Sequence, residues 1–238
     1  MQREAAEPGS RATTVDDAEL IYVGDPMCSW CWAFAPVLDE VQARYRVRVR
    51  TVVGGLRTGG AAQPMDPAAR VSLGRYWRQV AERTGQPFTT ASLERGDWVY
   101  DTEPSCMAVV AMRGLRPDKT LRWMARLQRA FYVEGVDITD LSVFPALAGE
   151  FGMDEARFAS ILGSDATRRG TWADFEEARS LGVAGFPTLL LRAGEQVEVV
   201  TRGYAPREDL EPVLARWLAT RDQRATADLT CDVDGGLC

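Results

Sequence analysis

The chain has 238 residues, of which 46% are apolar, and this is enough for a sizeable core in one large domain or two small ones. Its 34 acidic and 28 basic residues are interspersed and give a net charge of -6, so we expect neither a nucleic-acid partner nor binding to an anionic membrane. The chain contains no histidine, which excludes a Ser-His-Asp triad, a Cys-His dyad and histidine ligation of a metal.

The N-terminal segment reads as a polar tail over residues 1–18. It lacks the apolar stretch of a secretory signal, and no later apolar run is long enough to span a membrane. We therefore expect a cytoplasmic protein. In a reducing compartment, two close cysteines are more often catalytic or metal-binding than a static bridge.

The first predicted elements are a strand, a helix and a second strand. Leu20–Gly24 is a short apolar run typical of a buried strand, and apolar residues at helical spacing follow from Trp32. Arg46–Val53 then alternates as a strand does, and Gly54 and Gly55 end it.

Two cysteines stand between the first strand and the helix, separated by Ser29 and Trp30. Cys28 and Cys31 are three residues apart, so they meet on one helical face and can close a disulfide. A helix start also supplies unpaired N–H groups and the positive end of the helix dipole, which favour a thiolate. The spacing therefore predicts a dithiol redox site.

The middle of the chain, from Leu56 to about Ser164, carries almost wholly helical signals. Helix starts are expected at Asp66 with Pro67, Thr102 with Pro104, Asp118, Asp140 and Asp154. This block contains no strand signal and reads as an all-helical subdomain.

The strand signal returns near the C-terminal end. Thr188–Arg192 and Val197–Thr201 flank a short turn, and an amphipathic helix follows with Leu210, Leu214 and Trp217 on one side. A strand-helix-strand opening and a strand-strand-helix close predict an α/β layer with the helical block inserted between its halves.

Several motifs, taken together, carry a family resemblance. They are the Cys28 to Cys31 site, Pro36 five residues beyond its second cysteine, the helical insertion, and the run Gly182 to Thr188, which contains Phe186 and Pro187. With these motifs in this order, the chain resembles the DsbA-like thioredoxin-fold family, and within it the FrnE-like branch.

The resemblance implies a thioredoxin-like fold with a large all-helical insertion. We expect the thioredoxin-like domain to comprise residues 19–57 and 165–220, with the inserted helical subdomain at 58–164. Residues 221–238 then form a C-terminal tail that holds a second cysteine pair.

The resemblance also implies that the Phe186–Pro187 peptide bond is cis and that Pro187 faces the cysteine pair, with the Phe186 backbone beside the disulfide. The alternative is a trans proline that begins an edge strand. An exposed Cys28 is expected to attack, and a more buried Cys31 to resolve the mixed disulfide. The predicted partners are protein thiols and disulfides, with glutathione or a thioredoxin system as reductant and no cofactor beyond the redox-active disulfide.

The residues between the cysteines predict the direction of electron flow. Strong oxidants of the family carry a histidine there, which stabilises the thiolate, whereas Ser29 and Trp30 offer no cationic partner. We therefore expect a less oxidising couple, suited to a reductase or isomerase.

The proton-transfer group is left open by the sequence. Asp25 could exchange a proton with Cys31, although a turn residue before Pro26 is the favoured interpretation. Many relatives carry a buried acid six residues before the first cysteine, where this chain has Tyr22. Trp30 and Trp32 either border a groove for unfolded protein or belong to the core.

The remaining cysteines have competing interpretations. Cys231 and Cys238 form either an accessory dithiol that exchanges with the first pair or a stapled or disordered tail. Cys106 reads as a buried, inert thiol. A zinc site built from the two pairs is formally allowed, but the longer second spacing argues against it, so no metal is predicted.

Two other functions remain open. One is a glutathione-dependent small-molecule isomerase or transferase of the kappa-class type, although those relatives usually have serine where Cys28 stands. The other is a non-catalytic DsbA-like adaptor that presents a partner to a protease.

Overall fold

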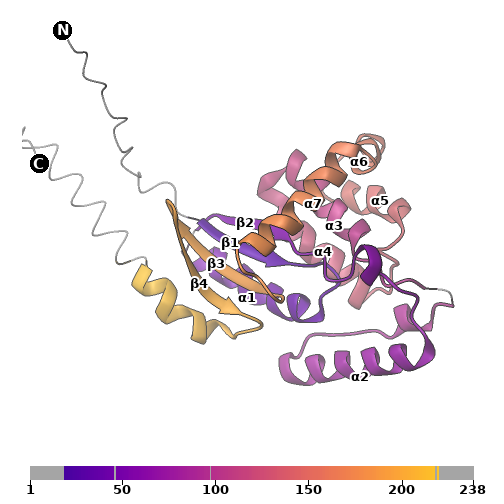
Figure 1. The fold of residues 1–238 in the computed structure, drawn as a ribbon, viewed down its shortest axis with the longest axis horizontal. Helices are drawn as coiled ribbons and strands as arrows, with labels where there is room; N and C mark the ends of the chain where they lie inside the picture. Colours follow the sequence, from indigo (N-terminus) through magenta and orange to yellow (C-terminus); the bar gives the residue numbers. More distant parts are fainter. Residues whose placement is uncertain (1–18, 46, 97, 218, 220–238) are drawn as a thin grey trace, which may run out of the picture.

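A computed structural model describes residues 19–45, 47–96, 98–217 and 219. A four-stranded mixed sheet lies at its centre in the order β2-β1-β3-β4 (Figure 1). The central strand β1 pairs parallel with β2 and antiparallel with β3, which in turn pairs antiparallel with β4. The strands are β1 (Glu19–Gly24), β2 (Val49–Val53), β3 (Thr188–Ala193) and β4 (Gln196–Arg202).

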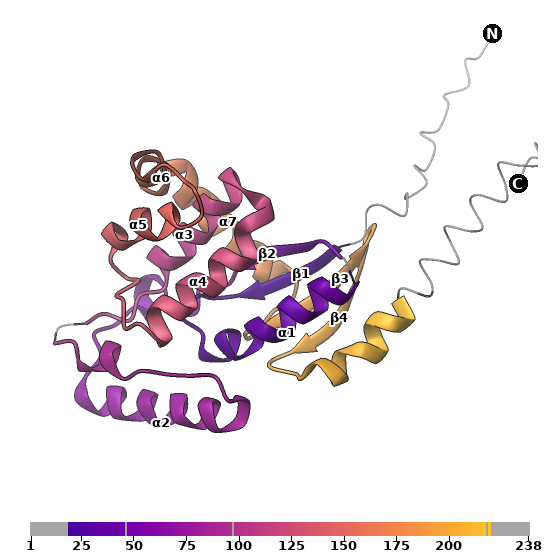
Figure 2. The same cartoon turned by 180° about the vertical axis from the view of Figure 1, so that it is seen from behind.

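The sheet is covered on both faces because side chains of β1 alternate between them. Leu20 and Tyr22 belong to the core that includes α1 (Ser29–Tyr45), whereas Ile21 and Val23 belong to a smaller cluster with Ala178 of α7. Figures 1 and 2 show α1 and α7, which spans Asp165–Ser180, on opposite sides of the sheet. Burial of β1 on both faces explains why its sequence is a continuous apolar run.

The chain between β2 and α7 is helical, as predicted. It contains α2 (Pro67–Thr84), α3 (Glu103–Leu115), α4 (Thr120–Tyr132), α5 (Phe144–Gly149) and α6 (Glu155–Leu162). Both α3 and α4 contact β2, and α3 also packs against α7, whereas α2 runs along one side of the molecule near α1 (Figures 1 and 2). This arrangement is an α/β thioredoxin-like layer with a helical insertion, which confirms the predicted fold class.

The predicted helix starts have mixed outcomes. Asp66 caps α2 by accepting from the Ala69 amide, and Asp154 caps α6 in the same way. The prediction for Asp118 is wrong, because α4 begins at Thr120 and Asp118 lies in the preceding 3-10 turn. The Asp118 carboxylate is held by Arg116 instead, and this ion pair competes with capping.

The C-terminal part of the described chain returns to the sheet. Residues 207–217 are helical, and Leu210 and Leu214 are each 1% exposed in the main core. The predicted amphipathic helix is therefore present. The predicted tails at 1–18 and 221–238 lie outside the described residues, and the domain boundaries given above stay a prediction.

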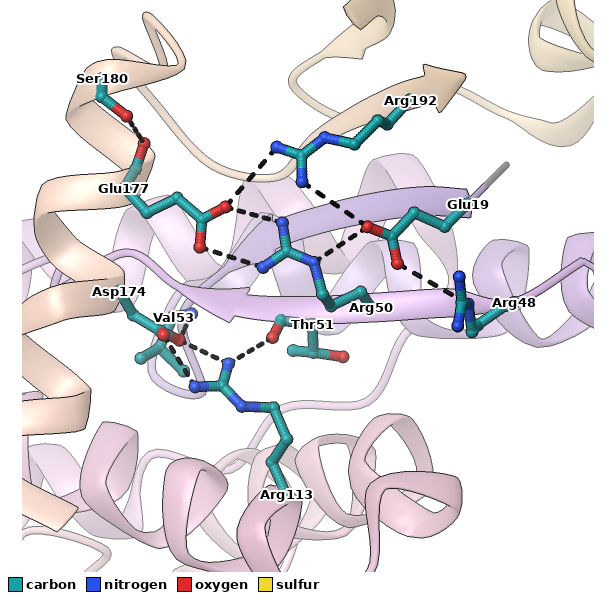
Figure 3. A network of polar contacts seen from close by, with 10 residues as sticks. All are labelled: Glu19, Arg48, Arg50, Thr51, Val53, Arg113, Asp174, Glu177, Ser180 and Arg192. Atoms are coloured by element: carbon teal, nitrogen blue, oxygen red, sulfur yellow. Dashed lines mark hydrogen bonds and ion pairs between the residues drawn. The ribbon is translucent and has the colours of Figure 1, made fainter. Parts of the chain in front are cut away.

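An ion-pair network ties the sheet to α7 (Figure 3). Arg50 of β2 donates to both carboxylate oxygens of Glu177, at 2.7 and 3.0 Å, and also to Glu19 at 3.2 Å. Deeper in the structure, Arg113 of α3 makes a two-point contact with Asp174, at 2.7 Å to each oxygen. Such bidentate pairs fix orientation as well as distance, so they fix the positions of α3, α7 and β2 relative to one another.

Candidate active site

The two cysteines of the predicted dithiol lie at the junction of β1 and α1. The Cys28 amide donates to the Asp25 carbonyl at 3.1 Å, and its carbonyl accepts from the Trp32 amide at 3.0 Å. Cys28 therefore occupies the N-cap position of α1, and Cys31 follows in the first turn. Both are free thiols in this structure, and their side chains are in hydrogen-bonding contact.

The sequence predicts an exposed Cys28, and this is wrong. Only 6% of Cys28 is exposed, and Cys31 is fully buried. The cause is tertiary packing. The loop before β3 that contains Phe186, called the Phe186 loop below, and side chains from the helical insertion cover the start of α1. Cys28 nevertheless lines an open cleft, whereas Cys31 does not, so the pair is reached through Cys28.

The loop before β3 lies directly against Cys28. The Phe186–Pro187 peptide bond is cis, as predicted. The Cys28 thiol donates to the Phe186 carbonyl at a sulfur-to-oxygen distance of 3.6 Å, and the Pro187 carbonyl accepts from the Gly203 amide at 2.7 Å. The loop is therefore anchored to the end of β4 while its Phe186 carbonyl faces the thiol.

The loop that leads into Cys28 is fixed by buried hydrogen bonds. The Asp25 carboxylate accepts from the Met27 amide at 2.8 Å and from the Leu56 amide at 2.7 Å. Two tyrosine hydroxyls, those of Tyr100 and Tyr132, both donate to the Met27 carbonyl. A buried backbone segment with all these groups paired has little freedom to move, so Cys28 has a defined position.

Asp25 has the turn role that the sequence favours, and its buried carboxyl also accepts a hydrogen bond from a cysteine thiol. Its bond to the Met27 amide is an Asx turn, as a residue before Pro26 should make. The side chain is also completely buried, and burial raises the pKa of its carboxyl. The thiol of Cys106, itself fully buried as predicted, donates to this carboxyl at 3.4 Å. The backbone of Asp25 hydrogen bonds to Cys31, while its carboxyl pairs with Met27, Leu56 and Cys106.

Tyr22 stands six residues before Cys28, where the family resemblance implies a buried acid, and its hydroxyl contacts Cys31. A Cβ atom added to Gly24 would lie 2.6 Å from the Tyr22 hydroxyl and 3.2 Å from the Cys31 sulfur, so both groups converge there. Burial raises the pKa of Cys31 well above its usual range, and the Tyr22 hydroxyl opposes this by hydrogen bonding to the sulfur. Burial also raises the pKa of Tyr22, which keeps its proton and acts as a donor.

The cleft beside Cys28 has a volume of about 440 Å³. Its walls come from residues 27–30 of the segment 25–31, which we call the dithiol loop, from residues 56–57 after β2, from helix α2 and from the Phe186 loop. The lining residues include Cys28, Ser29, Trp30, Leu56, Arg57, Met65, Tyr76, Tyr100 and Phe186. A cleft of this size suits a small molecule or a short peptide segment.

Trp30 forms part of the cleft wall, whereas Trp32 is a core residue. The Trp30 indole donates to the Tyr76 hydroxyl of α2, and its ring packs on Tyr204 at 5.7 Å. Trp32 is 8% exposed and donates to the Pro87 carbonyl at 3.1 Å. Of the two interpretations of these tryptophans, the groove position therefore applies to Trp30 and the core position to Trp32.

The sequence model of the DSBA-like thioredoxin domain family matches residues 19–211. The chain belongs to this family. The match covers the sheet, the dithiol loop, the inserted helices and the cis-proline loop of this DsbA-like protein.

Solved structures similar to this DsbA-like chain include disulfide oxidoreductases. A candidate protein disulfide isomerase from Nitrosomonas europaea is 37% identical, with a TM-score of 0.78, over 85% of this chain and 98% of that chain. The cytosolic disulfide reductase DsbM from Pseudomonas aeruginosa is 29% identical, with a TM-score of 0.72, over 85% of this chain and 99% of its own. The Pseudomonas protein has also been solved with glutathione.

A curated relative of the DsbA-like chain is an adapter protein and not an oxidoreductase by name. The ClpXP adapter protein SpxH of Halalkalibacterium halodurans is 26% identical over 176 residues, which are 70% of this chain. The aligned part spans 56% of the length of that adapter protein.

The remaining expectations concern the second cysteine pair, a metal site and a membrane-spanning helix. Cys231 and Cys238 lie outside the described residues, so their pairing stays a prediction. Within the described part of the chain, no three His, Cys, Asp or Glu side chains are grouped to hold a metal. The same part contains no helix that is both long and apolar enough to cross a membrane.

Sequence reasoning missed the residues that the helical insertion contributes to the site. Tyr100 and Tyr132 reach the dithiol loop from this insertion, and Arg57, just before the insertion begins, lines the cleft. The local sequence pattern around these three residues gives no functional signal. Asp25 is a candidate from the sequence because it lies three residues before Cys28, whereas Tyr22 is noted only because the family resemblance implies a buried acid at its position.

Proposed function

We propose that this DsbA-like protein reduces or isomerises protein disulfides through Cys28 and Cys31. The observation that carries the proposal is the difference in access between the two thiols. Cys28 lines the cleft beneath the Phe186 carbonyl, whereas Cys31 is fully buried behind it. A thiol that meets substrate and a second thiol shielded from it are what the two steps of disulfide exchange require.

In the reducing direction, the Cys28 thiolate attacks one sulfur of the substrate disulfide. A mixed disulfide forms, and the other substrate sulfur leaves as a thiolate that takes up a proton. Cys31 then loses its proton and attacks the Cys28 sulfur, which releases the second substrate thiol. The enzyme ends with a Cys28–Cys31 disulfide, and two electrons have passed to the substrate.

The Pro187 loop is proposed to receive the substrate backbone. The Phe186 carbonyl accepts from the Cys28 thiol in the reduced state, so it becomes available once that sulfur enters a disulfide. An extended substrate segment with a free N–H group could then pair with it. Ser29 and Trp30 line the same cleft and would contact the substrate from the other side.

The proposed direction of electron flow rests on the residues between the cysteines. Neither Ser29 nor Trp30 carries the positive charge that stabilises a thiolate in strong oxidants. We expect a reduction potential well below about -120 mV, the value of the oxidant DsbA. A redox titration that gives a value near that of DsbA would reverse the proposed direction.

Glutathione or a thioredoxin system in the cytoplasm is the proposed source of electrons. A disulfide reductase that is 29% identical to this chain is cytosolic by its description and has been solved with glutathione. No resident cofactor or metal is needed, because the dithiol itself carries the electrons.

Insulin reduction with single cysteine variants tests the proposal. Cys28→Ser is expected to abolish activity, and Cys31→Ala is expected to accumulate mixed disulfides with many proteins. Cys106→Ser is the matched control, since serine keeps a donor for the Asp25 carboxyl. Retention of most of the activity by Cys28→Ser would disprove the assignment.

A non-catalytic adaptor is the second candidate, favoured by the similarity to the ClpXP adapter proteins. An adaptor would bind one partner through a surface and would not need the thiols. The Cys28→Ala, Cys31→Ala double variant separates the two functions. Equal binding of a single partner by this variant and by the unmodified protein, without trapped mixed disulfides, would support the adaptor.

The tail pair is proposed as an accessory dithiol that exchanges with Cys28 and Cys31. Turnover of the Cys231→Ser, Cys238→Ser variant is expected to fall if this shuttle operates. Unchanged turnover would leave the tail without a redox role. The kappa-class alternative is disfavoured because this chain keeps a cysteine at position 28.

A further inference from the structure

Arg57 is the one charged side chain among the described residues that line the cleft. The other lining residues are aromatic, aliphatic, thioether, thiol or hydroxyl groups. A guanidinium group in such a setting attracts anions more strongly than it would in open water, because the apolar walls keep solvent screening low.

The backbone of Arg57 is fixed in place. The Arg57 amide donates to the Thr102 hydroxyl at 3.2 Å, and the Arg57 carbonyl accepts from the Thr102 amide at 2.8 Å. The neighbouring Leu56 amide is held by Asp25. The segment that carries Arg57 is thus bonded to both the dithiol loop and the start of α3.

The side chain is also oriented, but its charge is not neutralised by a neighbour. The guanidinium carbon lies 4.9 Å from the centre of the Tyr100 ring, and one nitrogen contacts the Met65 sulfur at 3.8 Å. Within the described residues no carboxylate pairs with Arg57, whereas Arg50, Arg113 and Arg126 each pair with at least one. Its remaining donors are available to a ligand.

Tyr100 links Arg57 to the reactive thiol. The Tyr100 ring stacks beneath the guanidinium, and its hydroxyl donates to the carbonyl of Met27, the residue before Cys28. Arg57 and Cys28 therefore line the same cleft and are linked through one intervening side chain, that of Tyr100. A ligand that reaches both must carry a sulfur and an anionic group.

We infer that Arg57 binds the carboxylate of a small, cysteine-derived thiol or disulfide while its sulfur reacts with Cys28. Carboxylate is the anion that a cysteine-derived thiol carries, and the cleft has the size of a small-molecule site. The inference rests on the proposed function, since it requires Cys28 to exchange disulfides. Arg57 acts as a specificity-determining residue and takes no part in bond breaking.

The reaction that Arg57 would assist is balanced by the thiols alone. The Cys28 thiolate attacks one sulfur of glutathione disulfide, forms a mixed disulfide and expels one glutathione thiolate. Cys31 then attacks the Cys28 sulfur and expels the second. Two electrons pass from the protein dithiol to glutathione, and the reverse sequence reduces the protein.

The test compares two probes with the reduced, full-length protein: glutathione disulfide, which is anionic, and bis(2-hydroxyethyl) disulfide, which is neutral. The second-order rate of dithiol oxidation is measured for the unmodified protein, Arg57→Gln and Arg57→Lys. Arg83→Gln is the control, because Arg83 lies over the Trp30 ring at 5.7 Å and does not line the cleft.

Arg57→Gln is expected to slow the reaction with glutathione disulfide on the order of fivefold to tenfold and to leave the neutral probe within about twofold. Arg57→Lys should recover part of the loss, and Arg83→Gln should change neither rate. An equal fall with both probes, or no fall with either, would overturn the inference.

A further arm does not depend on a variant that folds. Glutathione disulfide esterified at its carboxylates should react at least about fivefold more slowly than the free acid with the unmodified protein. Equal rates would overturn the role of Arg57. Failure of the unmodified protein to react with any of the disulfides would instead refute the proposed function itself.

Discussion

The ring of Phe186 fills the space above Gly54 that any side chain at position 54 would need. A Cβ atom built on Gly54 would overlap the ring. The same phenylalanine offers its carbonyl to Cys28, and the Gly54 amide donates to the Gly24 carbonyl at 2.8 Å. The end of β2 therefore sets the position of the loop that contacts the reactive thiol.

Substitution of Gly54 by alanine should displace this loop. We expect Gly54→Ala to lower the insulin reduction rate about tenfold and to cost about 1–3 kcal/mol of unfolding free energy, as overpacking does. The control is Gly60→Ala, since an added Cβ there meets nothing within 4 Å. Urea unfolding and the rate of insulin reduction are measured on both variants. Unchanged activity of Gly54→Ala would show that the Phe186 carbonyl need not stay beside Cys28.

Removal of the Tyr22 hydroxyl should slow the second step of exchange. The hydroxyl lowers the pKa of Cys31 against the larger opposing effect of burial, so Tyr22→Phe should raise that pKa further. Each unit of increase lowers the thiolate fraction tenfold but raises its nucleophilicity about threefold, so the resolving step slows about threefold per unit. The loss should shrink as the pH rises.

An aromatic disulfide that releases a coloured thiol measures both steps on the reduced protein. The first burst reports attack by Cys28, and the second phase reports attack by Cys31 on the mixed disulfide. Tyr22→Phe should slow only the second phase, and Tyr45→Phe at the far end of α1 should slow neither. A slower first phase in Tyr22→Phe would point to a general structural effect.

The order of elements and the dithiol could be predicted from the sequence, because both leave local signals. The apolar run of β1, the helical spacing of α1 and the Cys28 to Cys31 spacing each depend on neighbours within a few residues. The one wrong helix start also has a local cause. Asp118 does not cap α4 because Arg116, two residues earlier, pairs with its carboxylate.

The surroundings of the thiols could not be predicted in this way. Tyr100 and Tyr132 donate to the same Met27 carbonyl from 73 and 105 residues away. The burial of Cys28 and the wall of the cleft that α2 and Tyr100 form likewise result from how the insertion folds back on the sheet. Hydrophobic periodicity carries no information about which distant side chain fills a given space.

Burial of Asp25 predicts a specific dependence of stability on pH. Its pKa is raised above the usual 3.8, so the folded chain holds this proton to a higher pH than the unfolded chain does. The contribution of Asp25 to the unfolding free energy therefore falls as the pH rises from about 3.8 through the folded-state pKa, and is level above it. Asp25→Asn should remove this fall.

The measurement is the difference in unfolding free energy between the unmodified protein and Asp25→Asn at each pH. The facing groups Cys106 and Tyr100 are present in both proteins, so their titration largely cancels. The difference should shift in favour of asparagine as the pH rises. Asp140→Asn should shift the opposite way, because hydrogen bonds from Ser142 lower the pKa of Asp140. The same direction for both variants would contradict the assignment.

The Arg113–Asp174 pair should be a larger source of stability than its exposed counterparts. The side chains are 25% and 7% exposed, and the Asp174 carboxylate also accepts from the Val53 amide at 3.0 Å. Arg113 in turn donates to the Thr51 carbonyl at 2.7 Å. Loss of either partner leaves the other with a buried charge that is no longer compensated.

Asp174→Ala is therefore expected to cost about 3–5 kcal/mol of unfolding free energy. Arg113→Met should cost a similar amount, and the double variant less than the two single losses together, because it leaves no unpaired charge. Urea unfolding of the four proteins completes a double-mutant cycle, and Glu176→Ala, whose partner Arg179 is 63% exposed, should be unchanged within error. Additive losses in the cycle would mean that the two side chains stabilise β2 and α7 independently, and that the ion pair itself contributes nothing.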